Sequence, residues 1–338
     1  MRCTTASLPV APRSAWGAAG ANSSRSGSAR VACRATPDKP IIAITGATGL
    51  VGSRLTAKLS ALGYTVHALT RNPQSAKAKL PYAGVRCVGP ADWERGLEGA
   101  TGVVNLAGEA IATRWNPQLK QEIKSSRINV TNRVVNAIKK QAPGSRPSVF
   151  ISASAVGFYG ISQTATFNED SPSGKDYLSQ VCREWEAAAM AAPSDVRTCV
   201  MRTGIVLARD GGAVGKMLPV FQLFAGGPLG TGRQWMSWIH RDDLVELIIE
   251  ALRNPGYVGT FNATAPKPVR MSEFCSTLGT IMGRPSWLPV PDFALTTLLG
   301  EGASVVLDGQ KVLPTKTQQA GFKWQYNDIE PALRSVVN

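Results

Sequence analysis

The segment TGATGLVG most constrains the fold of this chain. It follows a short apolar run, IIAIT, of the kind that forms a buried parallel strand, and it leads into a helical stretch. Gly46 permits a tight turn, Gly49 lets the backbone approach a pyrophosphate, and Gly52 lets helix and strand pack closely. The segment therefore predicts a dinucleotide-binding loop, with Thr48 and Leu50 beside the helix N-terminus that would hold the anion.

Five further β-branched runs alternate with helical stretches over the first 204 residues. They are VHALT, VRCV, VVNLA, SVFISA and RTCVMR, which begin at residues 66, 85, 103, 148 and 197. Strands that alternate with helices form right-handed βαβ units and a parallel sheet with helices on both faces. The predicted fold class is α/β, with a doubly wound parallel (Rossmann) sheet.

The pattern changes after Gly204. Gly-rich loops surround the helical KMLPVFQLF, another helix follows IHRDD, and the Pro-rich PSWLPVPD precedes a closing stretch. This predicts a smaller C-terminal substrate-type lobe at the edge where open α/β sheets bind ligands. The predicted domains are a leader over 1–37, an NAD(P)-binding Rossmann domain over 38–204, substrate-lobe and crossover elements over 205–287, and a small extra domain over 288–338.

The first 37 residues differ from the rest in composition. They hold five arginines and six serines, with no acidic residue before Asp38, and they lack the continuous apolar core of a secretory signal. This composition is typical of an organelle transit peptide. The stretch RVACRA resembles a chloroplast processing site, with cleavage near Cys33. We therefore predict a chloroplast rather than a mitochondrial destination, and a merely disordered N-terminus is the alternative.

Charge and composition restrict the classes of partner. The formal net charge of +14 falls by five without the leader's arginines, and the remaining basic residues form no run of four. No nucleic-acid partner is therefore expected, and a solvated basic surface is favoured over contact with an anionic membrane. No stretch of 18 apolar residues predicts a membrane span.

The cysteines and histidines restrict the chemistry further. Cys87, Cys182 and Cys199 lie after the leader, as does Cys275, and none has CxxC spacing, which suits a reducing compartment such as stroma. Only two histidines are present in the chain, so no metal site is expected.

The end of the second predicted strand, ALTRNP, indicates which dinucleotide is bound. NAD sites place an acid there to accept a hydrogen bond from the ribose 2′-hydroxyl. This chain has Arg71 and no acid. An arginine pairs with a 2′-phosphate, which a carboxylate would repel. The sequence therefore predicts NADP(H), with a plain surface arginine as the alternative.

Several motifs together resemble those of the extended, or epimerase-like, short-chain dehydrogenase/reductases: TGATGLVG, NLAG, SASAVGFYG, RTGIVL and WIHRDDL. Longer ones, NLAGEAIATRW, DYLSQVCREWE and GGPLGTGRQWMSWIHRDDL, are similar to the "epimerase family" proteins of the 39U type, as is the passage from about 288 to 333. The resemblance covers nearly everything after the leader. Plant and algal members are related to the giant-chloroplast (SulA-like) protein, so the resemblance implies a positive role in plastid division.

The resemblance implies roles for the residues that match. Ser154 corresponds to the serine that hydrogen-bonds the reacting oxygen, and Tyr177 to the tyrosine that gives or takes the proton. Asn105, Ala107 and Gly108 match the segment that lines the adenosine side of the cofactor cleft. Each proposed catalytic residue has a structural alternative, the serine in a loop after a strand and the tyrosine in packing at a helix start.

One departure from the family pattern concerns proton transfer. Active relatives have a lysine one helical turn after the tyrosine, which holds the nicotinamide ribose and lowers the tyrosine pKa. This chain has Val181 there, and neither Lys175 nor Arg183 occupies the same position. Tyrosine–lysine catalysis is therefore compromised, unless the tertiary structure supplies a distant cation.

A second departure concerns the substrate. Sugar-nucleotide epimerases generally have an arginine for the diphosphate two residues after the glutamine of GRQWM, where this chain has Met236. A thioether cannot pair with a phosphate. Trp235 and Trp238 indicate an apolar or planar ligand or, alternatively, a packed lobe interface. His240 fits a structural role better than acid–base chemistry, with one of the two aspartates of IHRDD as the helix cap.

Three more residues, Glu109, Arg114 and Trp115, are characteristic of the 39U branch and are candidates to line the pocket. We therefore expect an NADP(H)-binding, oxidoreductase-like protein of the chloroplast stroma, with atypical or lost Tyr–Lys catalysis and an unknown small-molecule substrate. Further expectations are peripheral contact with the stromal side of the inner envelope and a protein partner in plastid division. The alternative is an active NAD(P)-dependent sugar-nucleotide epimerase or dehydratase.

Overall fold

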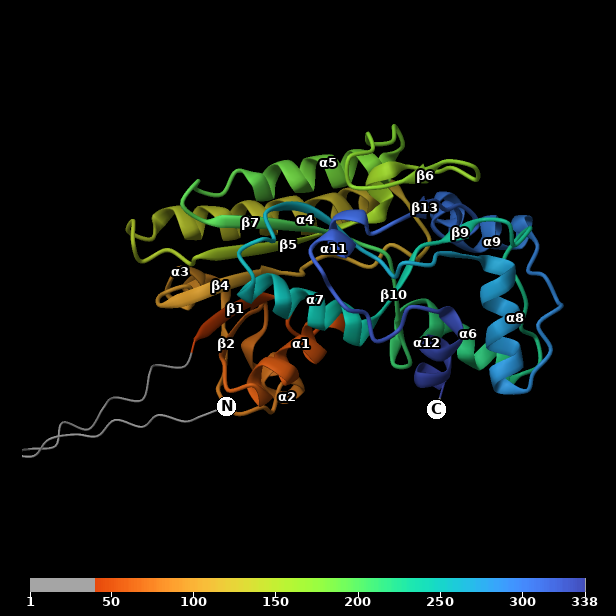
Figure 1. Ribbon diagram of the computed structural model, residues 1–338, viewed down its shortest axis with the longest axis horizontal. Helices are drawn as coiled ribbons and strands as arrows, with labels where there is room; N and C mark the ends of the chain where they lie inside the picture. The colour runs from red at the N-terminus through yellow and green to blue at the C-terminus, as the bar shows by residue number, and fades with distance from the viewer. Residues whose placement is uncertain (1–39, 338) are drawn as a thin grey trace, which may run out of the picture. The chain divides into compact units, whose positions relative to one another are not determined.

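The computed structural model describes residues 40–337, so the predicted leader over 1–37 lies outside the described residues. At its centre is a sheet of seven parallel strands (Figure 1). They are β1 (Ile41–Thr45), β2 (Thr65–Leu69), β3 (Val85–Val88), β4 (Ala100–Asn105), β5 (Val149–Ala155), β7 (Arg197–Thr203) and β11 (Gly259–Ala263). Their order is β11-β7-β5-β4-β1-β2-β3, which confirms the predicted doubly wound parallel sheet.

Helices cover both faces of this sheet, with α4 and α5 above it and α1 and α7 below it in Figure 1. The longer helices are α1 (Leu50–Ala61), α2 (Pro73–Lys79), α4 (Pro117–Lys140), α5 (Tyr177–Met190), α6 (Gly212–Gln222), α7 (Arg241–Arg253), α8 (Met271–Met282), α9 (Asp292–Leu299) and α12 (Ile329–Val337). Among residues 40–337, no helix combines the length and the hydropathy needed to cross a membrane.

Short elements connect these helices and strands. The short helices are η1 (Pro90–Asp92), α3 (Trp93–Gly96), η2 (Val156–Tyr159), η3 (Gly300–Ala303), α10 (Ser304–Leu307) and α11 (Thr315–Gln319). The short strands are β6 (Thr166–Phe167), β8 (Ile205–Ala208), β9 (Trp235–Met236), β10 (Trp238–His240), β12 (Val269–Arg270) and β13 (Lys311–Val312). They form three separate two-stranded ladders, β10 with β8, β12 with β9 and β13 with β6.

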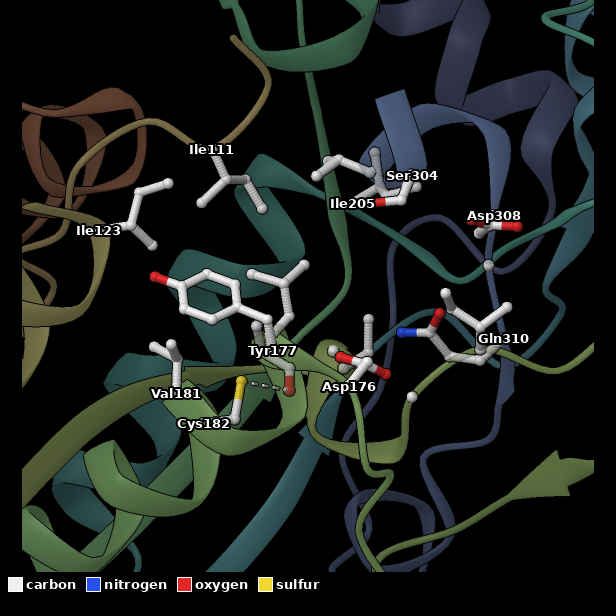
Figure 2. Close-up of a pocket in the computed structure, with 18 of the residues that line it drawn as sticks. Ile111, Ile123, Asp176, Tyr177, Val181, Cys182, Ile205, Ser304, Asp308 and Gln310 are labelled. Atoms are coloured by element: carbon white, nitrogen blue, oxygen red, sulfur yellow. Dashed lines mark hydrogen bonds between the residues drawn. The ribbon is translucent and has the colours of Figure 1, made fainter. Parts of the chain in front are cut away.

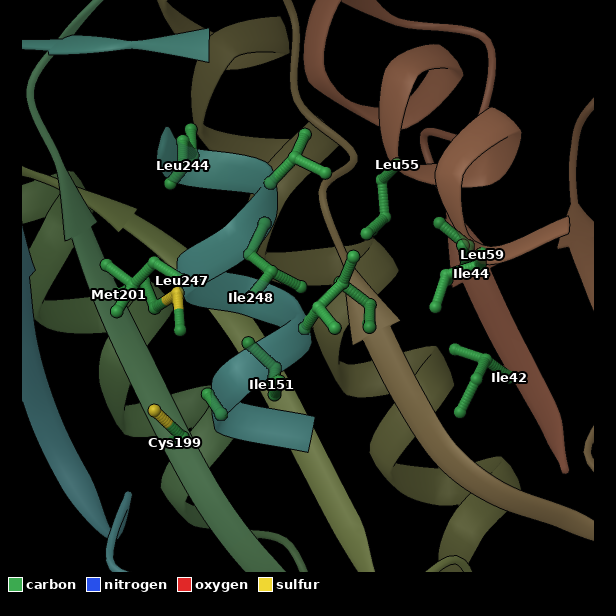
Figure 3. Close-up of a cluster of buried hydrophobic side chains, with 14 of the residues drawn as sticks. Ile42, Ile44, Leu55, Leu59, Ile151, Cys199, Met201, Leu244, Leu247 and Ile248 are labelled. Carbon is green, nitrogen blue, oxygen red and sulfur yellow. The ribbon is translucent and has the colours of Figure 1, made fainter. Parts of the chain in front are cut away.

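Hydrophobic side chains of the central strands alternate between the two faces, because successive residues of a strand point to opposite sides. On one face Ile44 of β1 packs with Leu59 of α1 and Ile248 of α7, in the cluster that Figure 3 shows. On the other face Ala43 and Phe150 pack against α3, α4 and α5. Burial of each large side chain stabilises the fold by about 1.5–3 kcal/mol, so the two clusters hold the sheet between its helices.

The seventh strand, β11, is not among the six apolar runs that predict the sheet. Its sequence, GTFNA, has one large apolar residue, Phe261, and begins with a glycine. Pairing with β7 makes it a strand, in parallel register from Gly259 opposite Cys199 to Ala263 opposite Thr203. Its extended conformation therefore depends on pairing with β7 and not on local β-propensity.

A third hydrophobic cluster lies beside the sheet. It contains the fully buried Trp238 and Phe274, and Met236 is almost completely buried with them. Helix α12 packs against α8 in the same cluster. Trp238 therefore belongs to the packed interface that the sequence offers as the alternative to a ligand contact, and the thioether of Met236 lies in a hydrophobic core.

The start of α7 corrects one sequence-based prediction. The N-cap residue is His240 and not one of the two aspartates: its Nδ1 accepts a hydrogen bond from the N–H of Asp242 at 3.1 Å. Asp242 instead pairs with Arg54 of α1 at 2.7 Å. Because the helix begins at Arg241, both aspartates already lie in its first turn and are too far along to cap it.

His240 has a structural role, as the sequence indicates. Its Nε2 lies 3.2 Å from the hydroxyl of Ser335 in α12, and its ring lies against that of Tyr326, with centroids 4.1 Å apart. The imidazole is buried, and burial lowers its pKa to about 4. It is therefore neutral in the folded protein near neutral pH, with Nδ1 free to accept the capping hydrogen bond.

Because of His240, the free energy of unfolding should decrease as the pH is lowered. The unfolded histidine takes up a proton near pH 6.5, whereas the folded one resists protonation until about pH 4. The free energy of unfolding should therefore lose up to about 3 kcal/mol between these values. His240→Asn keeps a capping oxygen without the titration, so urea unfolding from pH 7 to 4 should show a shallower decline. An identical decline in variant and wild type would contradict this assignment.

Candidate functional site

Three neighbouring cavities lie along the carboxyl ends of the sheet strands. The phosphate-loop cavity, about 660 Å³, lies beside Gly46 and Arg71. The connecting cavity, about 270 Å³, lies beside Gly46 and Ser154. The apolar cavity, about 470 Å³, surrounds Tyr177. Each shares lining residues with the next: Gly46 belongs to the first two and Thr203 to the last two.

The predicted glycine loop adopts the turn that its sequence requires. Gly46 has a φ of +70°, and a Cβ there would lie 2.7 Å from the carbonyl carbon of Leu106. A Cβ on Gly52 would lie 2.1 Å from the carbonyl oxygen of Gly46. A side chain at either position would therefore collide with backbone, so the first glycine allows the turn and the third allows close packing.

The N-terminus of α1 is open to an anion. Its N-cap, Gly49, has no side chain to accept a hydrogen bond from the first-turn N–H groups, and that turn has no acidic residue. Uncapped N–H groups and the helix dipole together favour a phosphate. Gly46, Thr48 and Gly49 line the phosphate-loop cavity, and Leu50 and Gly52 line the connecting one. These features fit a dinucleotide with its pyrophosphate at α1.

Arg71 lies where the phosphate-loop cavity meets the end of β2. Its side chain is exposed, and it makes no hydrogen bond or ion pair within the part of the chain that the structure describes. Ser75 lines the same cavity at the first turn of α2, which Asn72 caps by accepting a hydrogen bond from the N–H of Ser75 at 3.1 Å. A guanidinium and a hydroxyl are therefore available beside the position expected for a ribose.

The residues at the end of β4 and just after it have two roles: some line the phosphate-loop cavity, and one supports it from beneath. Ala107 and Gly108 line the phosphate-loop cavity, whereas Asn105 is fully buried beneath it. The Asn105 Oδ1 accepts a hydrogen bond from the hydroxyl of Thr45 at 2.6 Å, and its Nδ2 donates to the hydroxyl of Thr131 at 2.8 Å. Asn105 therefore positions the lining backbone, and its side chain is occupied.

Ser154 lies near the end of β5, with its side chain 2% exposed in the connecting cavity. Its hydroxyl donates a hydrogen bond to Glu186 Oε1 at 2.6 Å. Arg202 holds the same carboxylate bidentately, with both N–O distances at 2.9 Å. A carboxylate paired in this way only accepts hydrogen bonds, so the serine proton is committed to it. Ser154 therefore presents oxygen lone pairs to the cavity, while its O–H points at Glu186.

Tyr177 projects into the apolar cavity from the first position of α5, whose N-cap is Asp176. Lys175 precedes this N-cap and lies outside the helix. The Tyr177 hydroxyl donates a hydrogen bond to the backbone carbonyl of Lys120 in α4. The rings of Trp115 and Tyr177 pack edge to face, with their centroids 5.5 Å apart. The phenol is thus held between two segments that are distant in the sequence.

The cavity walls are mostly apolar. Figure 2 shows the Tyr177 ring among Ile111, Ile123 and Val181, with Asp176 and Asp308 on the opposite side. The apolar lining residues are Ile111, Trp115, Ile123, Ala155, Val156, Ile161, Leu178, Val181, Trp185, Ile205, Trp235 and Val305. Val181 thus contributes a hydrophobic surface where relatives with the lysine would present an ammonium group.

Burial and nearby cations act on Tyr177 in opposite directions. Burial raises the pKa of its phenol, while the charges of Lys120, Arg127 and Lys124 in α4 lower it, and burial outweighs them. The tertiary structure therefore supplies the distant cations that the helix lacks, but the phenol stays protonated near neutral pH. The thiol of Cys182, in the same cavity, is also protonated, because burial raises its pKa to about 12.

The charged groups of the apolar cavity are mainly carboxylates. Among the described residues that line it, Asp176, Glu301 and Asp308 are acidic and Arg127 is the one cation. The Arg127 guanidinium donates to the carbonyl of Ile123 at 2.9 Å and to that of Glu109 at 2.8 Å. Burial, followed by the charges of Asp292 and Asp176, raises the pKa of Asp308. The cavity therefore disfavours an anion.

The three residues characteristic of the 39U branch lie at different places in the structure. Trp115 lines the apolar cavity and Glu109 the phosphate-loop cavity, whereas the exposed Arg114 donates to the carbonyl of Thr297 at 2.7 Å. Trp235 also lines the apolar cavity, in contrast to the buried Trp238.

Sequence reasoning missed the residues that surround Tyr177 from other elements. Lys120 and Arg127 come from α4, and Glu301 and Asp308 from the C-terminal segment. No motif marks them, because none lies within one helical turn of the tyrosine. Among residues 40–337, no group of three or more His, Cys, Asp or Glu side chains could hold a metal ion.

Comparison with known proteins places the chain among relatives. Residues 42–263 match the NAD dependent epimerase/dehydratase family, and residues 290–336 match a domain of unknown function, DUF1731. The chloroplastic SDR39U1 homolog of Arabidopsis thaliana, an epimerase family protein, is 53% identical over 299 residues, 88% of this chain and 86% of the relative.

Two solved structures illustrate the range of relatives. Human epimerase family protein SDR39U1 (isoform 2), crystallised with NADPH, superposes with a TM-score of 0.79 at 34% identity, over 88% of this chain and 98% of the other. The nucleoside-diphosphate sugar epimerase of Corynebacterium glutamicum superposes with a TM-score of 0.69 at 31% identity. That alignment covers 88% of this chain and 58% of the other.

The Ser154–Glu186–Arg202 arrangement gives a stability prediction. Glu186→Gln keeps the shape but leaves the buried Arg202 guanidinium without a counter-charge, which should cost about 3–5 kcal/mol of unfolding free energy. The matched control is Glu184→Gln in the same helix, which removes a half-exposed pair with Lys124 and should cost at most about 1 kcal/mol. Urea unfolding measures both, and equal losses would contradict the buried pair's importance.

Proposed function

We propose that this protein is an NADP(H)-binding, oxidoreductase-like protein with atypical catalysis. The chain belongs to the NAD dependent epimerase/dehydratase family and to its SDR39U1-type branch. The observation that carries this proposal is the phosphate-loop cavity, where an uncapped helix N-terminus and Arg71 face one space. The NADPH in the human relative's crystal structure supports it.

The choice of NADP(H) over NAD(H) depends on charge. The pyrophosphate would lie at the N-terminus of α1, against the backbone of Gly46 and Gly49. The 2′-phosphate would then lie near Arg71, which has no acidic neighbour at the end of β2. An arginine binds a phosphate through paired charge-assisted hydrogen bonds, which the 2′-hydroxyl of NAD(H) cannot reproduce.

Bound NADP(H) would supply or accept a hydride. In such a reaction this chain would place Tyr177 in a cavity with mostly apolar walls, where its hydroxyl donates a hydrogen bond to the Lys120 carbonyl. Ser154 would contact a substrate hydroxyl only as a hydrogen-bond acceptor, since its own O–H already donates to Glu186. Proton transfer by a protonated tyrosine without its usual lysine is the atypical feature of the proposed catalysis.

The apolar cavity argues against a sugar nucleotide as substrate. A diphosphate would meet Asp176, Glu301 and Asp308, and the one lining cation, Arg127, is engaged with two carbonyls. Sugar-nucleotide epimerisation is the alternative, because the corynebacterial relative is named a nucleoside-diphosphate sugar epimerase. The walls fit an uncharged substrate with an aromatic or aliphatic body better, because they offer apolar contact and no free phosphate-binding group.

A chloroplast location is also part of the proposal. The predicted leader over 1–37 and the chloroplastic name of the Arabidopsis relative both support it. A stromal position and a positive role in plastid division follow from the resemblance to the giant-chloroplast (SulA-like) protein, and peripheral contact with the inner envelope belongs to the same expectation. In this role the bound cofactor would stabilise the surface that meets a division partner.

Calorimetric titration with NADPH and NADH tests the cofactor. Wild type should prefer NADPH, and Arg71→Ala should weaken NADPH binding about ten- to a hundredfold while leaving NADH unchanged. Arg86→Ala, an exposed arginine on the neighbouring strand β3, is the matched control and should alter neither. A wild type that binds neither dinucleotide, or that prefers NADH, would refute the proposal.

Complementation of a plant line lacking the gene tests the biological role. Gly49→Asp places a carboxylate at the N-terminus of α1, where it repels a pyrophosphate, so this variant should fail to restore normal chloroplast size. Thermal unfolding of the purified variant confirms that it folds. Tyr177→Phe separates binding from chemistry, and it should restore normal plastids if cofactor binding alone is needed. Restoration by Gly49→Asp would show that the role needs no cofactor.

A further inference from the structure

The C-terminal segment of unknown function forms one wall of the apolar cavity. Its elements η3 and α10, with the turn that follows, line the side opposite Val181 (Figure 2). The lining residues from this segment are Glu301, Ser304, Val305, Asp308, Gly309 and Gln310. Nearly a quarter of the cavity lining therefore comes from outside the part of the chain that matches the epimerase family, which ends at residue 263.

The same segment is tied to the loop before α4. The carbonyl of Leu299 accepts a hydrogen bond from the N–H of Trp115 at 3.1 Å. Gly302 packs so closely on this loop that a Cβ would lie 2.3 Å from the carbonyl oxygen of Thr113. Because Trp115 itself contacts the Tyr177 ring, the segment and the tyrosine share one supporting loop.

Lys120 connects the segment to the tyrosine directly. Its ammonium group lies over the Tyr177 ring, 4.9 Å from the centroid, and 2.7 Å from a carboxylate oxygen of Glu301. Its backbone carbonyl accepts the Tyr177 hydroxyl hydrogen bond. One residue of α4 thus holds the phenol at both its ring and its hydroxyl.

Other charged groups near Tyr177 are engaged elsewhere. Lys124 pairs with Glu184 at 2.8 Å, and Arg127 stacks on Trp185 while its N–H groups bind carbonyls. Among the described residues, Lys120 is the cation that stacks on the tyrosine ring. The remaining charges that line the cavity are the carboxylates of Asp176 and Asp308, described above, and the thiol of Cys182 is protonated.

We propose that Lys120 and Glu301 are positioning residues for Tyr177. Lys120 supplies from α4 the cation that Val181 removes from α5, and Glu301 of the C-terminal segment holds that cation over the ring while offsetting part of its charge. The segment of unknown function thereby completes the cavity and adjusts the ionisation of the tyrosine. This inference deepens the proposed function and rests on it, because the ionisation matters for catalysis only if Tyr177 transfers a proton.

The directions of the effects follow from Coulomb's law. A cation beside a phenol stabilises the phenolate, so removing Lys120 should raise the pKa of Tyr177. Removing the negative charge of Glu301 leaves the Lys120 ammonium uncompensated, so that change should lower it. Two substitutions within one ion pair are thus expected to shift one group in opposite directions, which loss of packing alone does not produce.

The ionisation of Tyr177 can be measured directly in the full chain without cofactor. We would place 3,5-difluorotyrosine at position 177, whose phenol ionises at a pH where proteins stay folded, and follow its ¹⁹F resonance against pH. Lys120→Met should raise the midpoint, and Glu301→Gln should lower it, each by at least about half a pH unit. Lys120→Arg keeps the charge and should leave the midpoint near that of wild type.

A matched control comes from the other end of the same helix. Lys140→Met removes a lysine of α4 that pairs with Glu94 at 2.5 Å, away from the cavity, and should leave the midpoint unchanged. An unchanged midpoint in both Lys120→Met and Glu301→Gln, or shifts of the same sign, would overturn the inference. If Lys120→Met fails to fold, Glu301→Gln and Lys120→Arg still give the answer.

The outcome is separable from that of the proposed function. Calorimetric titration with NADPH reports the cofactor, and the ¹⁹F titration of the apo protein reports the tyrosine. Opposite shifts in a protein that binds no dinucleotide would support the charge coupling and refute the cofactor. Binding of NADPH without a shift in the Tyr177 midpoint would support the cofactor and refute the charge coupling.

Discussion

The position of β1 between β2 and β4 is the constraint on which the rest of this site depends. Parallel pairing brings the carboxyl ends of all three strands to one edge, with Thr45 opposite both Leu69 and Asn105. The strand order reverses at this point, so the following loops separate and leave a crevice. The buried Asn105 secures the arrangement, since its amide joins β1 to β4 and, through Thr131, to α4.

From this edge the character of the site changes along the three cavities. The phosphate-loop cavity has uncapped helix N–H groups and the Arg71 guanidinium, which suit an anion, although Glu109 and Glu122 also belong to its lining. The apolar cavity has hydrophobic walls and three carboxylates, which suit a neutral molecule. Between them Glu186, paired with Arg202, accepts the hydrogen bond that the Ser154 hydroxyl donates. The electrostatic design therefore separates a place for the dinucleotide from a place for a different kind of ligand.

Local sequence patterns predicted most of the sheet and the glycine loop. Six of its seven strands are apolar β-branched runs, whose hydrophobicity is visible without any partner. The strand β11 is different, because GTFNA becomes extended only by pairing with β7. The cap of α7 is similar, since the imidazole of His240 accepts a hydrogen bond only as a neutral group, and burial against α12 keeps it neutral. Sequence alone favoured the aspartates, which are the commoner caps.

By itself the sequence determined the parallel sheet, the glycine turn with its phosphate-binding geometry, and the absence of a lysine at position 181. These depend on residues within a few positions of one another, where backbone geometry and side-chain periodicity act. Only the tertiary structure decided what surrounds Tyr177, because Lys120 lies 57 residues away from it and Glu301 a further 181 residues from Lys120. Electrostatic interactions act through space and not along the chain, so a cation missing from one helix can be supplied by another.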